Sequence, residues 1–112
     1  MLALRLVLLF LLIAANTLLH VPPLLVVALF KAVLPFQRVR VASNPVLTGL
    51  AESWIGVNSW MWDRFTGTRL QLDEDVALQA DGHYLVLANH QSWVDILVLQ
   101  KVFNRRIPLL RF

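Results

Sequence analysis

The chain has 112 residues, of which 58% are hydrophobic and only 15% are charged. Soluble domains usually contain about 45–50% apolar and about 25% charged residues, so this composition indicates a membrane segment joined to one small domain. The net charge of +3 without a dense Lys/Arg stripe argues against nucleic acid as a partner, and the absence of cysteine excludes disulfides, thiolate nucleophiles and cysteine-ligated zinc.

The first third of the chain is predicted to be a membrane helix. About 25 residues separate Arg5 from Lys31, and they would span about 37 Å as a helix, against about 30 Å for a hydrocarbon core. Pro22 and Pro23 would kink this helix. A single spanning or deeply embedded helix is favoured, and a hairpin turning at the two prolines is the second interpretation. A cleaved signal peptide is disfavoured, because the apolar run continues past its small residues.

The basic residues indicate an orientation for this segment. Lys31, Arg38 and Arg40 follow it, whereas Arg5 and the amino terminus precede it. The positive-inside rule then places the C-terminal part of the chain in the cytoplasm.

A second helix is predicted from Val46 to Phe65. Ser43-Asn44-Pro45 has the composition of a helix start, and Gly67 is expected to end the helix. The helix carries Trp54, Trp60 and Trp62. These indoles suit either a helix lying in the membrane interface or one packing its stripe on the domain core.

The remaining residues predict an α/β fold class. Thr68–Leu72 alternates like a strand, and the apolar run Tyr84–Ala88 is typical of a strand buried on both faces. A helix is expected over Ser92–Phe103, followed by an extended piece at Ile107–Leu110. Strand, helix and strand in this order predict the first βαβ portion of an α/β domain.

His90 and Asp95 are the candidate catalytic pair. His90 would follow the carboxyl end of the second strand, where open α/β sheets bind ligands, and Asp95 would lie in the first turn of the next helix. A neutral imidazole can remove a proton from an alcohol, and a carboxylate can orient that imidazole. The alternative is structural, because Ser92 and Asp95 also have the spacing of a capping box.

The stretch Asn89-His90-Gln91-Ser92-Trp93-Val94-Asp95 resembles the first signature block of the glycerol-3-phosphate and lysophosphatidic acid acyltransferase family, in its bacterial branch. The resemblance implies His90 as catalytic base and Asp95 as its orienting acid, with Asn89, Ser92 and Trp93 as supporting residues. It also implies transfer of a fatty acyl group from acyl-CoA or acyl-carrier protein to the hydroxyl of a lysophospholipid such as 1-acyl-glycerol-3-phosphate. No metal and no bound cofactor is expected, since the acyl donor is a co-substrate.

The resemblance also sets the expected organisation of the chain. Residues 1–42 are predicted to be a membrane-embedded segment with a basic linker, and residues 43–112 the N-terminal part of an acyltransferase domain in the bacterial inner membrane, on the cytoplasmic side. The family's later blocks, which include an Arg for the acceptor phosphate and a Phe-Pro-Glu-Gly stretch, are not in this sequence. We therefore expect a fragment that is inactive alone. The competing function is a non-catalytic small membrane protein with an interfacial, Trp-rich helix.

Overall fold

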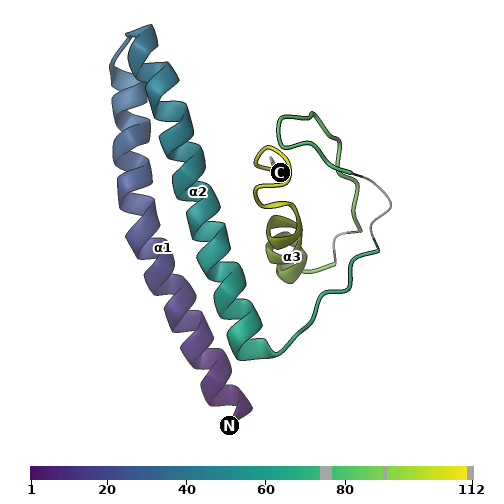
Figure 1. Ribbon diagram of the computed structural model, residues 1–112. Helices are drawn as coiled ribbons and strands as arrows, with labels where there is room; N and C mark the ends of the chain where they lie inside the picture. Colours follow the sequence, from purple (N-terminus) through teal and green to yellow (C-terminus); the bar gives the residue numbers. More distant parts are fainter. Residues whose placement is uncertain (74–76, 90, 111–112) are drawn as a thin grey trace.

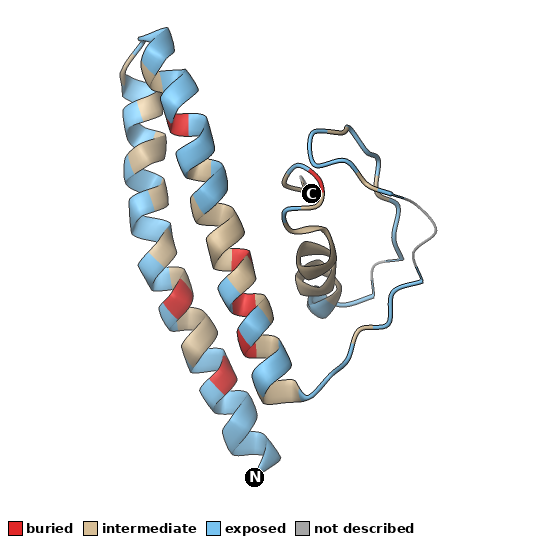
Figure 2. Ribbon diagram, in the orientation of Figure 1, coloured by how far each residue is buried: buried red, intermediate tan, exposed pale blue. Residues whose placement is uncertain are grey.

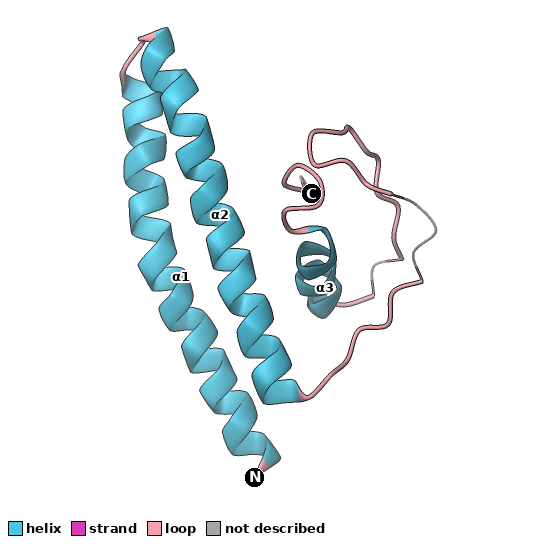
Figure 3. Cartoon of the chain, viewed as in Figure 1, coloured by secondary structure: helices cyan, strands magenta, loops and turns pink. Residues whose placement is uncertain are grey.

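The computed structural model describes residues 1–73, 77–89 and 91–110. Its helices are α1 (Leu2–Val33), α2 (Gln37–Thr66) and α3 (Trp93–Phe103). α1 and α2 form a long hairpin, α3 lies beside α2, and an extended loop joins α2 to α3 (Figure 1). Outside these helices, the described residues form only loops and turns (Figure 3).

The predicted α/β fold is therefore wrong, because the described residues contain no strand. The three segments expected to be extended, 68–72, 84–88 and 107–110, are not paired with one another. A strand is stable only when its N–H and C=O groups bond to a neighbouring strand, and even two paired strands are marginal in water. Leu85 and Leu87, which were predicted to be buried within the second strand, are 86% and 85% exposed. The loop between α2 and α3 is mostly coloured as exposed in Figure 2.

α1 continues without interruption through Pro22 and Pro23, so the hairpin interpretation centred on these prolines is wrong. Their rings remove the N–H groups that would bond to the carbonyls of Leu18 and Leu19. The flanking turns still bond, and the chain reverses only after Val33, at residues 34–36. By length and composition α1 is able to cross a membrane, and only 11% of its most apolar window is buried inside the protein.

α2 starts at Gln37, ahead of the predicted start at Ser43-Asn44-Pro45, and Pro45 lies inside the helix. The Ser43 hydroxyl donates to the carbonyl oxygen of Val39 (2.7 Å), one turn earlier, and does not cap a helix start. The predicted end is confirmed. Gly67 closes α2 with a φ of 65°, a left-handed conformation that glycine adopts without a steric penalty.

α1 and α2 pack antiparallel along a row of polar side chains. The Asn16 amide donates to the side-chain oxygen of Asn58 (2.8 Å) and to the carbonyl oxygen of Trp54 (3.2 Å). The Trp54 indole N–H donates to the Thr17 hydroxyl (3.1 Å). Asn16 and Asn58 are both buried, so their amides satisfy each other where water cannot reach.

His20 continues this row toward the turn of the hairpin. Its Nδ1 lies 3.0 Å from the carbonyl oxygen of Asn16, and its Nε2 lies 3.2 Å from the Ser53 hydroxyl. A carbonyl only accepts, so Nδ1 is the donor, and in the neutral ring Nε2 accepts from Ser53. We call Asn16, Thr17, His20, Ser53, Trp54 and Asn58 the polar ladder, because together they hold the two helices in one register.

Candidate functional site

α3 begins and ends as the sequence predicts. Ser92 is its N-cap, with an extended backbone (φ −154°, ψ 164°), and Asn104 is its C-cap. The Asn104 N–H donates to the carbonyl oxygen of Gln100 (2.9 Å), which completes the last turn. The predicted helix Ser92–Phe103 is therefore confirmed, apart from Ser92 being the cap.

The Asp95 carboxylate turns back over the start of α3. Its Oδ2 accepts the backbone N–H of Gln91 (2.7 Å) and the backbone N–H of Ser92 (2.8 Å). Ser92 and Asp95 form a capping box, which is the structural role that the spacing allowed. A carboxylate offers about four acceptor positions, so the two bonds to Oδ2 do not exclude a second role for Asp95.

His90 lies outside the described residues, so its approach to Asp95 stays a prediction. Of the predicted supporting residues, Asn89 is exposed in the loop and Ser92 caps α3. Trp93 is 83% exposed at the first position of the helix. The structure thus brings Asp95 and Ser92 together and leaves Trp93 facing outward.

An open hollow of about 1140 Å³ adjoins Asn89. The loop before Asn89 forms one part of its lining, and residues 107–110 form another. Ile96 and Leu99 line it from α3. Ligand sites for small molecules are usually concave and mostly apolar, and this hollow has both properties beside the candidate site.

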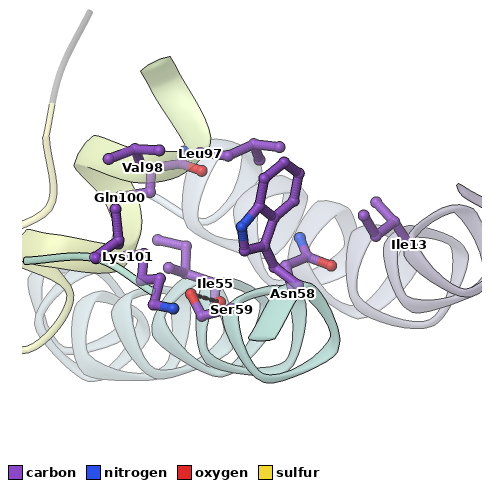
Figure 4. A pocket seen from close by; sticks show the side chains of 10 residues that line it. Ile13, Ile55, Asn58, Ser59, Leu97, Val98, Gln100 and Lys101 are labelled. Atoms are coloured by element: carbon purple, nitrogen blue, oxygen red, sulfur yellow. Dashed lines mark hydrogen bonds between the residues drawn. The ribbon is translucent and has the colours of Figure 1, made fainter. Parts of the chain in front are cut away.

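α3 packs against α2 through both apolar and charged side chains. Leu97 and Val98 face a small cavity of about 20 Å³ that Ile55 and Ser59 line from α2, and Ile13 reaches it from α1 (Figure 4). Space of that size holds about one water molecule. Lys101 of α3 forms an ion pair with Asp63 of α2.

A second set of polar contacts holds the end of α3. The Asn104 amide donates to the carbonyl oxygen of Glu52 (3.1 Å), and the Arg105 side chain lies 3.6 Å from the Glu52 carboxylate. Asn104 Oδ1 is buried without a hydrogen-bond partner among the described atoms. Glu52 therefore fixes the C-terminal end of α3 against the middle of α2.

The tryptophans of α2 divide between the two roles that the sequence left open. Trp54 bonds to Thr17 inside the hairpin, and Trp62 lines the cavity under α3. Trp60 is 63% exposed. Most of this set therefore packs within the protein, and Trp60 is the indole of α2 that faces the surroundings.

The sequence did not point to the hollow or to the polar ladder. No pattern in the sequence distinguishes Ile96 and Leu99, which line the hollow, from the other apolar residues of α3. Asn16, Thr17 and His20 were visible as polar interruptions three and four residues apart in an apolar helix. That spacing places them on one face, which is the available signal for a helix partner.

Among the described residues, no group of three or more His, Asp or Glu side chains gathers as metal ligands. No protein-family model matches the chain, and neither a curated protein nor a solved structure matches it.

Proposed function

We propose that this chain carries the acid–base pair of a glycerolipid O-acyltransferase, with His90 as general base and Asp95 as its orienting acid. The observation that carries the proposal is the position of the Asp95 carboxylate. It is held on the backbone N–H of Gln91, which follows position 90 in the sequence, within the pattern Asn-His-x4-Asp. The carboxylate is thus held at the residue that follows the proposed base in the sequence.

The proposed reaction needs no protein nucleophile. His90 removes the proton from the hydroxyl of a lysophospholipid while that oxygen attacks the acyl thioester carbon. The tetrahedral intermediate then releases the thiolate, which takes the proton back from the imidazolium. The products are the new ester and the free thiol of the donor. Asp95 favours the productive tautomer and stabilises the imidazolium.

The apolar lining of the hollow beside Asn89 supports the proposal that the substrate carries an acyl chain. Its lining includes Leu85, Ile96 and Leu99, which suit an acyl chain better than a polar metabolite. Acyl-CoA or acyl-carrier protein is the proposed donor, and 1-acyl-glycerol-3-phosphate or a related lysophospholipid is the proposed acceptor. Neither requires a bound cofactor or metal.

Acyl transfer in membranes from cells that carry the gene tests this function. His90→Ala is expected to lower the rate by about 10²–10⁴-fold, the usual contribution of a general base. Asp95→Asn is expected to cause a loss of similar order, since an amide cannot stabilise the imidazolium. Asp73→Asn, which neutralises an exposed carboxylate in the same loop that does not line the hollow, is the matched control and should leave the rate unchanged.

The competing function is a non-catalytic membrane protein, favoured by the complete capping box at Ser92 and Asp95. Under it, Asp95→Asn is harmless, because the amide oxygen accepts the same two backbone N–H groups. Wild-type acyl composition at every glycerolipid position in cells carrying His90→Ala would therefore rule out the enzyme and leave this function.

We further propose that the α1–α2 hairpin is embedded in the bacterial inner membrane from the cytoplasmic side. α2 packs along α1 and returns the chain toward the end where Met1 lies (Figure 1). A crossing by α1 alone would leave α2 in the hydrocarbon together with Glu52, at a cost of several kcal/mol for an ionised side chain. A hairpin lying in one leaflet avoids this cost.

Single cysteines test the location, because the natural chain has none. Gln37→Cys marks the hairpin turn and Gln71→Cys marks the loop after α2, and both positions are exposed. An impermeant maleimide should label both in inside-out vesicles and neither in right-side-out vesicles. Labelling of Gln37→Cys from the outer side would show that the hairpin crosses.

A further inference from the structure

The charges of this chain are segregated along the sequence. No Asp or Glu precedes Glu52, whereas Arg5, Lys31, Arg38 and Arg40 all lie before it. All seven acidic residues therefore belong to the part of the chain that contains the second half of α2, the loop and α3. An excess of one charge sign in one region creates a local field that attracts the opposite charge.

Three of these four basic residues gather at the hairpin tip, which we define as residues 30–44. Lys31 Nζ donates to the Asn44 side-chain oxygen (2.6 Å), which ties the end of α1 to the start of α2. Arg40 lies one helical turn before Asn44 on the same face of α2. Arg38 is exposed in the first turn of α2, which contains no acidic residue.

The hairpin tip also exposes large apolar side chains between its charges. They are Phe30, Val33, Phe36 and Val41, each more than half exposed. Neither arginine of the tip has a carboxylate within ion-pair distance in the part of the chain that the structure describes. The tip therefore combines apolar side chains with unneutralised cations, as membrane-surface segments do.

We propose that the hairpin tip is a binding surface for anionic phospholipid headgroups, with Lys31, Arg38 and Arg40 on the lipid phosphates and Phe36 and Val33 among the upper acyl carbons. Three cations cannot remain in hydrocarbon without a large cost, so the tip has to reach a headgroup layer. An anionic leaflet strengthens membrane binding by about fivefold for each Lys or Arg near its surface. This proposal rests on the proposed membrane location, but not on acyl transfer or on His90.

Lipid binding to the purified chain in neutral detergent micelles tests the proposal. Phosphatidylglycerol and phosphatidylcholine are titrated separately, and native mass spectrometry reports the bound lipid. Wild-type protein should bind phosphatidylglycerol more tightly than phosphatidylcholine. The double variant Arg38→Gln/Arg40→Gln should lower the phosphatidylglycerol affinity by about 25-fold at about 0.1 M salt, which is two factors of about five.

The matched control is Arg64→Gln/Arg69→Gln, which removes the same charge from exposed positions near the other end of α2. It should change the affinity by less than about twofold, because charges further apart than a Debye length are screened. Circular dichroism verifies that both variants keep the helical content of the wild type. An unchanged affinity in the tip variant, or an equal loss in the control, would overturn the proposal, even where acyl transfer is intact.

Discussion

In the α1–α2 hairpin, most backbone N–H groups bond to carbonyls four residues earlier within the same helix. The loop between α2 and α3 has the opposite character. In its described residues, 67–73 and 77–89, only one backbone N–H bonds to a backbone carbonyl, from Gly82 to Gln79 (3.0 Å). Its most apolar segment, Tyr84–Ala88, carries two leucines that are almost fully exposed.

This difference shows how two apolar segments obtain different structures. A helix satisfies its backbone hydrogen bonds locally, so the long apolar sequence of α1 forms a helix without needing a partner strand. An extended segment depends on a partner strand for its hydrogen bonds. The hairpin adds tertiary contacts through the polar ladder, whereas the loop contributes mainly exposed side chains.

The largest effect on the hairpin is expected at Asn16 and Asn58. Asn58→Leu removes the side-chain partner of the buried Asn16 amide and leaves only its bond to the Trp54 carbonyl, which should cost about 1–3 kcal/mol in the free energy of unfolding. Asn16→Leu should cost a similar amount, and the double variant less than the sum of the two. Unfolding of the purified protein in detergent, followed by circular dichroism, measures these changes.

Ser59→Ala is the control for the polar ladder, because its hydroxyl bonds within α2 to the carbonyl oxygen of Ile55 (2.8 Å; Figure 4). It should cost clearly less than either asparagine variant. If the losses in the free energy of unfolding of the two asparagine variants add strictly, the polar ladder does not couple the two helices. The hairpin would then differ from the loop only in its local backbone hydrogen bonds.

Smaller changes in stability, opposite in sign, are expected from substituting two glycines, one within α2 and one at its end. Gly67→Ala should destabilise the end of the helix by about 1 kcal/mol, because alanine tolerates the left-handed φ of 65° poorly. Gly49→Ala should stabilise the protein by about 0.5–1 kcal/mol, because Gly49 lies within the helix and an added Cβ meets no atom within 4 Å. Thermal unfolding measures both changes. A shift of the unfolding midpoint in the same direction for both variants would contradict the assignment of Gly67 as the helix end.

The helices were largely predictable because their signals are local. The apolar run before Lys31 indicated α1, the spacing of apolar residues with Gly67 indicated most of α2, and Ser92 with Asp95 indicated the start of α3. The start of α2 was missed because Ser43 and Pro45 resemble a helix start, although the Ser43 hydroxyl bonds back to Val39. The strands were wrongly predicted because alternation describes a side-chain pattern and contains no information about a partner.

Of the candidate site, the sequence alone supplied the hypothesis that His90 and Asp95 form a catalytic pair, and it predicted the capping geometry that holds the Asp95 carboxylate. Both depend on residues within a few positions of one another. Only the tertiary structure decided which side of α3 faces the hollow, where α2 lies along α1, and that Lys31, Arg38 and Arg40 gather at one end. Those features depend on contacts between residues far apart in the chain, such as Asn16 with Asn58, which no local pattern specifies.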